Sequence, residues 1–324
     1  MIDVIIPVYN TPLEDLKRCL DSIDSQTFKD YTVYIIDDGS GEVTHKWLDN
    51  YVTDKDNFIV RHVVNGGVSK ARNLGIEISN SKYFTFLDAD DTVSEKFLEE
   101  AFTLIEENDL DLIVGGYREI CDGEVLRVRN SLEDLKIYEN DTLKLFLDKL
   151  ISGKVQEDNK EIGLAPLGRI YTRLYRRSVL GNLRFREDVF MSEDTLYMIE
   201  LMKLVKRVGL TNLVWYDYYL NSYSISNKKL DEKVIKRNLK FIEEIYLLMK
   251  SEVDPRIKNS YKIRILKGIK PLYENVSVAE KKNILELEYV REGLLGVDLS
   301  GYKDILKEEE FLRELNLNED INNR

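Results

Sequence analysis

Short apolar runs alternate with amphipathic helical patterns over the first third of the chain. Between the runs, apolar residues recur at spacings of three and four, as at Leu13, Leu16, Leu20 and Ile23, which is typical of helices with one buried face. Such repeated strand and helix units indicate a mostly parallel sheet with right-handed crossovers. The runs are rich in β-branched residues, as in strands covered on both faces, and lie at Val4-Ile5-Ile6, Val33-Tyr34-Ile35-Ile36, Phe58-Ile59-Val60, Tyr83-Phe84-Thr85-Phe86-Leu87 and Leu112-Ile113-Val114. We therefore predict an α/β, Rossmann-like fold for residues 1–116.

The pattern changes after Gly116. Residues 119–140 are polar and show no regular period, and helical spacing then returns from Leu143 to Ile151. We interpret residues 117–225 as an extension of the first domain, because their apolar runs are too few for a separate core. Residues 226–324 are predicted to be a helical C-terminal region, with a proline near one helix start; the residues that support this are Phe241, Ile245, Leu248, Pro255, Ile257, Tyr261, Ile265 and Ile269.

Composition narrows the class of protein. A chain of 324 residues with 43% hydrophobic content can bury a sizeable core. The net charge of −12 argues against general binding of nucleic acid. Two cysteines do not suggest a disulfide scaffold, and no apolar run approaches the ~20 residues that span a bilayer. Because no signal peptide is evident either, we expect a cytoplasmic protein, or one bound peripherally to the inner face of the cell membrane.

A group of carboxylates, Asp88-Ala89-Asp90-Asp91, follows the fourth predicted strand. Side chains two apart on an extended segment point the same way, so Asp88 and Asp90 can converge on one ligand. Their repulsion is relieved if one binds a divalent metal ion and the other accepts hydrogen bonds from a ribose. A solvated acidic turn before a helix is the alternative. Because ligands bind at the carboxyl ends of strands in open α/β sheets, we predict a nucleotide and metal site here.

Polar motifs also follow the first three strands. In Pro7-Val8-Tyr9-Asn10, the Tyr9 ring can stack on a base. In Asp37-Asp38-Gly39-Ser40, the Asp38 carboxylate can accept a hydrogen bond from a base N–H, which uracil offers. Residues 65–73, with the sequence Asn-Gly-Gly-Val-Ser-Lys-Ala-Arg-Asn, place a glycine turn before a helix that carries Arg72, an arrangement that tolerates anions. Each motif alone could be ordinary turn chemistry, but together they favour a nucleotide site.

The four motifs stand in the order and spacing of the family 2 glycosyltransferases with the GT-A fold, and the resemblance covers residues 1–225. It implies a nucleotide-sugar donor, usually a UDP-sugar, a Mn²⁺ or Mg²⁺ ion, and inversion at the anomeric carbon. By position, Asp90 would hold the metal, Asp88 the ribose side, and Tyr9 and Asp38 the base. The predicted nucleotide-binding residues are Pro7, Tyr9, Asn10, Asp38, Asn65, Arg72 and Asp88.

Inversion also needs one carboxylate that takes a proton from the acceptor hydroxyl. Met191-Ser192-Glu193-Asp194 matches the acidic pair of the family, so Asp194 is the predicted base and Glu193 lies on the acceptor side. A helix start capped by Ser192 is the alternative, and both can hold at once. Gly168 and Arg169 resemble the segment that lines the acceptor site, although Leu167 stands where many relatives have tryptophan.

Two further features leave alternatives open. Residues 256–270 carry six basic residues and no acid beside an apolar stripe, which suits either an anionic membrane surface or packing within the domain or on a second subunit. A homo-oligomer through the C-terminal helices is therefore one expectation. His45 and His62 are too few and too separated in the sequence to indicate a metal site, and we interpret both as structural.

The sequence thus predicts a non-processive enzyme that transfers a sugar to a glycan, glycoprotein or lipid-linked acceptor in bacterial surface polysaccharide or glycoprotein glycan synthesis, because the Gln-x-x-Arg-Trp motif of processive synthases is missing. A sugar-nucleotide pyrophosphorylase is one alternative, although it would want a glycine-rich loop with an arginine where this chain has Tyr9-Asn10-Thr11-Pro12. A non-catalytic partner subunit with the same fold is the other.

Overall fold

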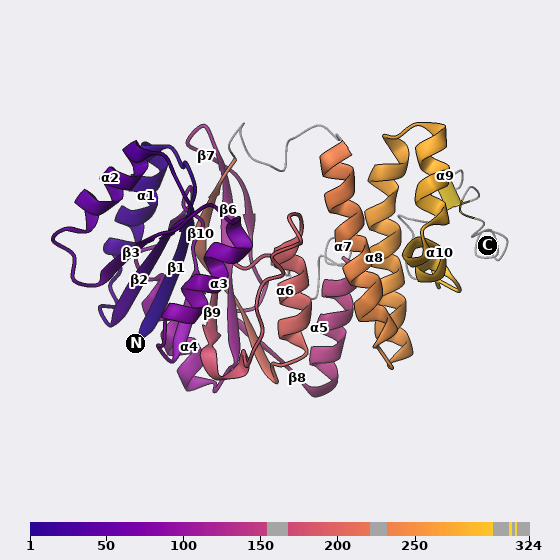
Figure 1. Ribbon diagram of the computed structural model, residues 1–324. Coiled ribbons are helices and arrows are strands. Elements are labelled where there is room, and N and C mark those ends of the chain that lie inside the picture. Colours follow the sequence, from indigo (N-terminus) through magenta and orange to yellow (C-terminus); the bar gives the residue numbers. More distant parts are fainter. Residues whose placement is uncertain (154–167, 221–231, 301–310, 313–314, 316–324) are drawn as a thin grey trace. The chain divides into compact units, whose positions relative to one another are not determined.

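The computed structural model describes residues 1–153, 168–220, 232–300, 311–312 and 315. The chain forms two compact units, Met1–Phe146 with Val155–Asn227 and Leu147–Lys154 with Lys228–Arg324 (Figure 1). From the sequence we expected a division after residue 225 and placed all of 117–225 in the first domain. The structure instead places the end of one helix, from Leu147, with the second unit.

One sheet organises the first unit, and its strand order is β3-β2-β1-β4-β9-β6-β10-β5, with β7 beside β6 and β8 beside β10. The described strands are β1 (Ile2–Val8), β2 (Tyr31–Asp37), β3 (Phe58–His62), β4 (Tyr83–Phe86), β5 (Thr92–Val93), β6 (Leu112–Cys121), β7 (Glu124–Arg129), β8 (Leu135–Glu139), β9 (Arg173–Arg176) and β10 (Arg207–Tyr219). The described helices of this unit are α1 (Leu13–Asp24), α2 (Glu42–Val52), α3 (Val68–Ile78), α4 (Phe97–Glu107), the start of α5 (Asn140–Ser152), the 3-10 turn η2 (Arg177–Val179) and α6 (Glu193–Met202). The predicted α/β fold is confirmed.

Parallel pairing brings the ends of the first strands to one edge of the sheet. β1 pairs in parallel with both β2 and β4, and β2 pairs in parallel with β3. The end of β1 lies level with the end of β2, because Val8 is opposite Asp37. Two backbone hydrogen bonds continue this alignment past the strands, from Asp38 N to Val8 O at 2.8 Å and from Leu87 N to Ile5 O at 3.1 Å. The polar motifs after these strands therefore lie together.

Close contact between α3 and β1 requires a glycine. Gly75 lies on the buried side of α3, where an added Cβ would come 2.3 Å from Cγ2 of Ile5. Such a distance is far inside van der Waals contact, so a larger residue would push the helix away from the strand. The helix that begins at Val68 is thereby held close to the strand end that carries Tyr9.

Residues 119–140, for which the sequence pattern predicted no element, contain the end of β6 and the strands β7 and β8. β6 and β7 form an antiparallel hairpin that turns at Asp122 and Gly123, both with positive φ (51° and 81°). The Asp-Gly pair is a strong hairpin signal that the sequence analysis overlooked. The hydrophobic pattern gave no help, because Val125, Leu126 and Val128 of β7 are exposed.

The second unit is helical over the residues described, as expected, and contains the end of α5 with α7 (Glu232–Lys250), α8 (Pro255–Glu274), α9 (Val278–Glu286) and α10 (Glu288–Leu294). Pro255 is the first residue of α8, and the Asp254 side chain caps this helix by accepting hydrogen bonds from the next backbone N–H groups. Figure 1 shows α7 and α8 side by side, as their packing requires. No described helix is long and apolar enough to cross a membrane.

Basic side chains of α8 make hydrogen bonds and ion pairs with other residues of this second unit. Arg264 is half-buried and donates to the carbonyls of Leu150 and Ile151 at 2.6 and 2.5 Å, and its loss of solvent lowers its pKa to about 10. Arg256 pairs with Asp148 at 2.8 Å. These charges therefore serve the last turn of α5, and the structure gives the membrane alternative no support of its own.

Candidate active site

Asp38 directly follows β2, at the edge of the sheet where the first strands end. Its carboxylate is buried and accepts backbone N–H groups from Gly66 at 2.7 Å and Gly67 at 2.8 Å, while Asn65 donates to the Asp38 backbone carbonyl at 2.9 Å. Asp38 thus holds the turn that begins α3. The structure brings the predicted residues Asp38 and Asn65 together, and a carboxylate with several lone pairs can accept a further hydrogen bond from a base.

The loop after β1 is tied to the loop after β2. Asn10 has a left-handed backbone (φ 50°), its N–H donates to Ser40 Oγ at 2.9 Å, and its Oδ1 accepts from Gly41 N at 2.9 Å. Pro7 lies inside β1, opposite Ile36. The Tyr9 side chain beside them is 56% exposed, so its ring face is available for stacking.

Arg72 joins the donor-side carboxylate to the acidic pair of α6. It is buried, its NH2 donates to Asp88 Oδ1 at 3.0 Å, and its NH1 donates to Asp194 Oδ1 at 2.8 Å and to Glu193 Oε1 at 3.2 Å. The Phe185 ring lies 5.4 Å from the guanidinium carbon. Arg72 thus contacts Glu193 and Asp194, which follow it by 121 and 122 residues. The sequence did not predict these two contacts.

Asp194 lies at the start of α6, where the Ser192 backbone is left-handed (φ 58°) and the Ser192 side chain makes no cap bond. Burial raises the pKa of Asp194 to about 7, helped by the negative charges of Glu193 and Asp88 and opposed by Arg72 and Arg169. A carboxylate whose pKa lies near neutrality suits proton transfer in both directions. The alternative of a helix start at Ser192 is confirmed, with Glu193 and Asp194 in the first turn, although the Ser192 side chain makes no cap hydrogen bond. The raised pKa of Asp194 is compatible with the predicted role of general base.

The acidic turn after β4 is fastened to β10 through Asp91. This carboxylate is buried, accepts from the Tyr216 hydroxyl at 2.6 Å and accepts from Tyr219 N at 2.8 Å. Burial raises the pKa of Asp91 well above its usual range, and the nearby charges of Asp90 and Asp88 raise it further. The sequence did not assign a role to Asp91. Its partners Tyr216 and Tyr219 lie on β10, more than a hundred residues later in the chain.

The residues around this turn fit a divalent cation that arrives with a phosphate. Asp88 and Asp90 add negative charge beside Asp91, whose pKa is raised chiefly by burial, and a cation bound there would relieve the repulsion among the three carboxylates. Among the described residues, these carboxylates do not form a set of three ligand atoms at metal spacing. Mg²⁺ and similar ions are commonly held by one or two carboxylates plus substrate phosphates, so the ligand set here would be completed by the nucleotide.

Gly168 and Arg169, the residues predicted for the acceptor side, lie near the start of α6. The carbonyl of Gly168 accepts from Thr195 Oγ1 of α6 at 3.3 Å. The Arg169 guanidinium lies 6.0 Å from the ring centre of Tyr171 and 5.9 Å from that of Tyr218. Tyr171 in turn stacks on Tyr216 with ring centres 4.4 Å apart. This tyrosine cluster was missed by sequence analysis, while Leu167 lies outside the described residues.

The two histidines, which are 17 residues apart in the sequence, lie next to each other in the structure. His45 and His62 stack with ring centres 3.5 Å apart beside Asp37. The parallel register of β2 and β3 places His62 opposite Asp37, which a count of sequence separation cannot reveal.

Comparisons with known proteins show what this chain is similar to. The model of "Glycosyl transferase family 2" matches residues 3–184. Glycosyltransferase GlyG of Streptococcus pneumoniae is 32% identical over 118 residues, which are 36% of this chain and 39% of GlyG. Poly(ribitol-phosphate) beta-N-acetylglucosaminyltransferase TarP of Staphylococcus aureus is 27% identical over 282 residues, 82% of this chain and 77% of TarP.

A solved structure shows the same fold. The crystal structure of S. aureus TarS residues 1–349 in complex with UDP-GlcNAc aligns with a TM-score of 0.68 and 19% identity, and covers 92% of this chain and 81% of that one. The chain spans less than two thirds of the length of several curated relatives, such as 39% of GlyG and 63% of EpsJ of Bacillus subtilis.

Proposed function

Because this chain belongs to glycosyl transferase family 2, we propose that it transfers a hexose or N-acetylhexosamine from a UDP-sugar to an acceptor hydroxyl, with inversion at the anomeric carbon. The arrangement of Arg72 carries the proposal, since this buried cation bridges donor-side Asp88 and the base Asp194. TarS has been solved with UDP-GlcNAc, which supports a UDP-sugar donor, and TarP is a beta-N-acetylglucosaminyltransferase, which supports transfer of an N-acetylhexosamine. The acceptor is a glycan, glycoprotein or lipid-linked sugar of the bacterial surface, and the reaction takes place in the cytoplasm or at its membrane.

In this mechanism the nucleotide binds at the edge of the sheet where β1, β2 and β4 end. Tyr9 stacks on uracil, Asp38 accepts its N3–H, and Asp88 accepts hydrogen bonds from the ribose. Asp90 would hold a Mn²⁺ or Mg²⁺ ion, which neutralises the departing diphosphate when it is bound. The role of the protein at this step is to orient the donor.

Asp194 then acts on the acceptor. An acceptor hydroxyl placed next to Asp194 Oδ gives up its proton to the carboxylate as its oxygen attacks the anomeric carbon, and the bond from that carbon to the diphosphate breaks. The negative charge of Asp194 is held near Arg72, which keeps the carboxylate oriented and partly ionised at neutral pH. Arg169 and the tyrosine cluster line the acceptor side.

A donor screen tests the proposal. UDP-glucose, UDP-galactose, UDP-GlcNAc and UDP-GalNAc are incubated with Mn²⁺, and UDP and pyrophosphate are both measured. UDP release from at least one donor is expected. In separate incubations that contain UTP and a sugar phosphate instead, pyrophosphate release would favour a pyrophosphorylase, and no turnover in either set would favour a non-catalytic subunit.

Asp194→Asn provides the site test. We expect transfer to fall by about 10³-fold or more, while UDP-sugar binding measured by calorimetry stays within a few fold, because the base acts only during transfer. Asp141→Asn is the matched control, since the Asp141 side chain is 100% exposed on α5. A rate for Asp194→Asn within a few fold of wild type would remove Asp194 from the mechanism.

A further inference from the structure

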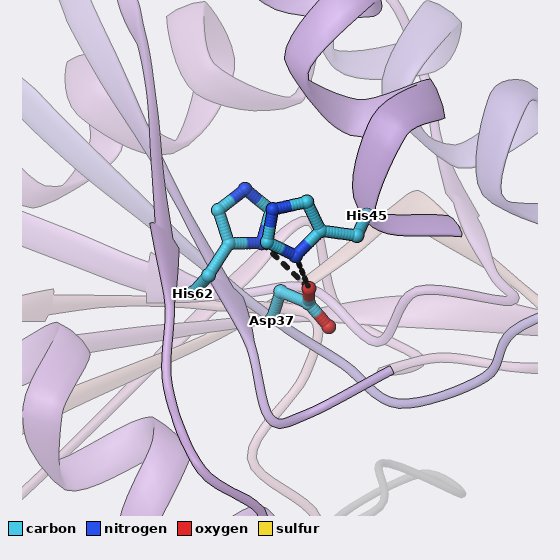
Figure 2. Close-up of side chains that lie close together, drawn as sticks. All are labelled: Asp37, His45 and His62. Carbon is cyan, nitrogen blue, oxygen red and sulfur yellow. Dashed lines mark hydrogen bonds and ion pairs between the residues drawn. The ribbon is translucent and has the colours of Figure 1, made fainter. Parts of the chain in front are cut away.

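Two histidines and a buried carboxylate converge beside the predicted nucleotide edge (Figure 2). Asp37 is the last residue of β2, His62 is the last residue of β3, and His45 lies in α2. All three belong to the first unit, and the parallel register places Asp37 opposite His62. None of them has a part in the proposed transfer reaction.

The ligand atoms face one another. Asp37 Oδ2 lies 2.6 Å from His62 Nδ1 and 3.7 Å from His45 Nδ1, and Figure 2 shows both ring nitrogens directed at this oxygen. Two ligand atoms on one tetrahedral zinc ion are roughly 3.3 Å apart, given Zn–N and Zn–O lengths of about 2.0–2.1 Å. The observed distances lie on either side of that value. A bound metal ion lies near the plane of each imidazole, so one of the two stacked rings, now 19° from parallel, would rotate out of the stack for all three atoms to share one ion.

The far side of each ring meets a second carboxylate. Asp49, one turn after His45 on α2, lies 3.1 Å from His62 Nε2 and 3.8 Å from His45 Nε2. A histidine that binds metal commonly donates its other ring N–H to a carboxylate, which fixes the tautomer. Asp49 is at hydrogen-bond distance from His62 Nε2 and could hold a proton there, while His45 Nε2 lies only within ion-pair range of Asp49. The proton that joins His62 Nδ1 to Asp37 Oδ2 at 2.6 Å would leave when a metal ion binds.

Asp37 is itself oriented for one ligand atom. Its Oδ1 accepts from Ser40 N at 2.9 Å, so only Oδ2 faces the imidazoles. An ion pair with Asp37 needs only one histidine. Here the His45 ring stacks on the His62 ring at 3.5 Å and also directs its Nδ1 atom toward Asp37 Oδ2. Protonation of both rings would bring like charges together, and one metal ion shared between neutral rings avoids this.

We propose that Asp37, His45 and His62 bind one divalent transition-metal ion of the Zn²⁺ class, through Oδ2 and the two Nδ1 atoms, with water in the fourth position and Asp49 as the orienting partner. This nitrogen-rich site differs from the oxygen site expected at Asp90, which suits Mn²⁺ or Mg²⁺. The metal would join α2 and β3 to the end of β2. It would thereby steady Asp38, the next residue, and the turn that Asp38 holds.

The two histidines are the only ones in the sequence, which permits a direct test. Zn²⁺ is titrated into the metal-stripped full chain labelled with ¹⁵N-histidine, and long-range ¹H–¹⁵N spectra follow the ring nitrogens. We expect both Nδ1 resonances to shift together and to saturate at one equivalent, with the protons on Nε2. No shift, a shift of one ring only, or metal on Nε2 would overturn the proposal.

Variants separate this site from the nucleotide site. His62→Asn is expected to abolish the zinc-induced rise in Tm, and Asp49→Asn to weaken zinc affinity by about 10–100-fold. Asp90→Asn is the matched control and should keep one high-affinity zinc ion, whatever its effect on sugar transfer. Zinc binding that is lost in Asp90→Asn and kept in His62→Asn would place the ion at Asp90 and refute this site, independently of whether the chain transfers sugar.

Discussion

Replacement of Arg72 by glutamine removes the cation that three carboxylates share. Its guanidinium is 2.8 Å from Asp194 Oδ1, and the Asp194 side chain is only 17% exposed. Two unit charges with centres roughly 4 Å apart interact by about 4 kcal/mol at an effective dielectric constant of about 20. Since one pKa unit corresponds to about 1.4 kcal/mol, loss of the cation should raise the pKa of Asp194 by about one to three units, the lower value applying if water enters.

The assay is the pH dependence of kcat/KM for sugar transfer. The base must be ionised, so the rate falls as pH drops through the pKa of Asp194, which lies at about 7 in the wild type. Arg72→Gln should move this acidic limb upward, whereas Arg72→Lys keeps the charge and should leave the limb near its original pH with a lower rate. Arg127→Gln, whose side chain is 64% exposed, is the matched control for loss of one positive charge and should move nothing.

One result would refute the reasoning. If Arg72→Gln folded and its acidic limb stayed at the wild-type pH, then either Asp194 would not be the base or Arg72 would not stabilise its charge. Because breaking a buried pair costs about 3–5 kcal/mol, denaturant unfolding must accompany the kinetics, and Arg72→Lys provides the folded comparison if the glutamine variant does not fold.

Three further predictions follow from other contacts. Asp90→Asn should raise the Mn²⁺ concentration for half-maximal transfer by about tenfold or more, measured with chelated metal buffers, and an unchanged requirement would place the metal elsewhere. Gly75→Ala should destabilise the fold by about 1–3 kcal/mol in urea, because the new Cβ would meet Ile5; a neutral effect would mean that α3 can shift freely. Tyr216→Phe should lower the free energy of unfolding by about 1–3 kcal/mol, because the Asp91 carboxylate loses a buried hydrogen bond, and it should raise the KM for the UDP-sugar. If stability and KM were both unchanged, Asp91 would not support the acidic turn that is expected to bind the UDP-sugar.

The strands and helices of the first third were predictable because each has a local signal. A run such as Val33–Ile36 is apolar because both faces of its strand are covered, and the spacing of Leu16, Leu20 and Ile23 matches the buried face of α1. The β6–β7 hairpin escaped notice because exposed apolar residues on β7 break the usual pattern. Only the Asp122-Gly123 turn carried the information.

The candidate site likewise contains residues that the sequence could indicate and contacts that it could not. Asp38, Asp88 and Asp194 could be picked out because carboxylates directly after strands or at a helix start are informative, although their roles remain predictions. The partners of Arg72 could not, since α6 follows it by more than a hundred residues and nothing local links them. The Asp37, His45 and His62 cluster was dismissed for the same reason, because separation along the chain says little about distance across a parallel register.

By itself, the sequence determined which segments become strands and helices and which polar residues stand at their ends, because periodicity and turn chemistry act over a few residues. The tertiary structure decided which of those residues meet: it buried Arg72 among three carboxylates, moved the pKa of Asp194 toward neutrality and stacked two histidines on one aspartate. The physical reason is that burial and charge pairing depend on strand order and register, which are set by the packing of the whole sheet.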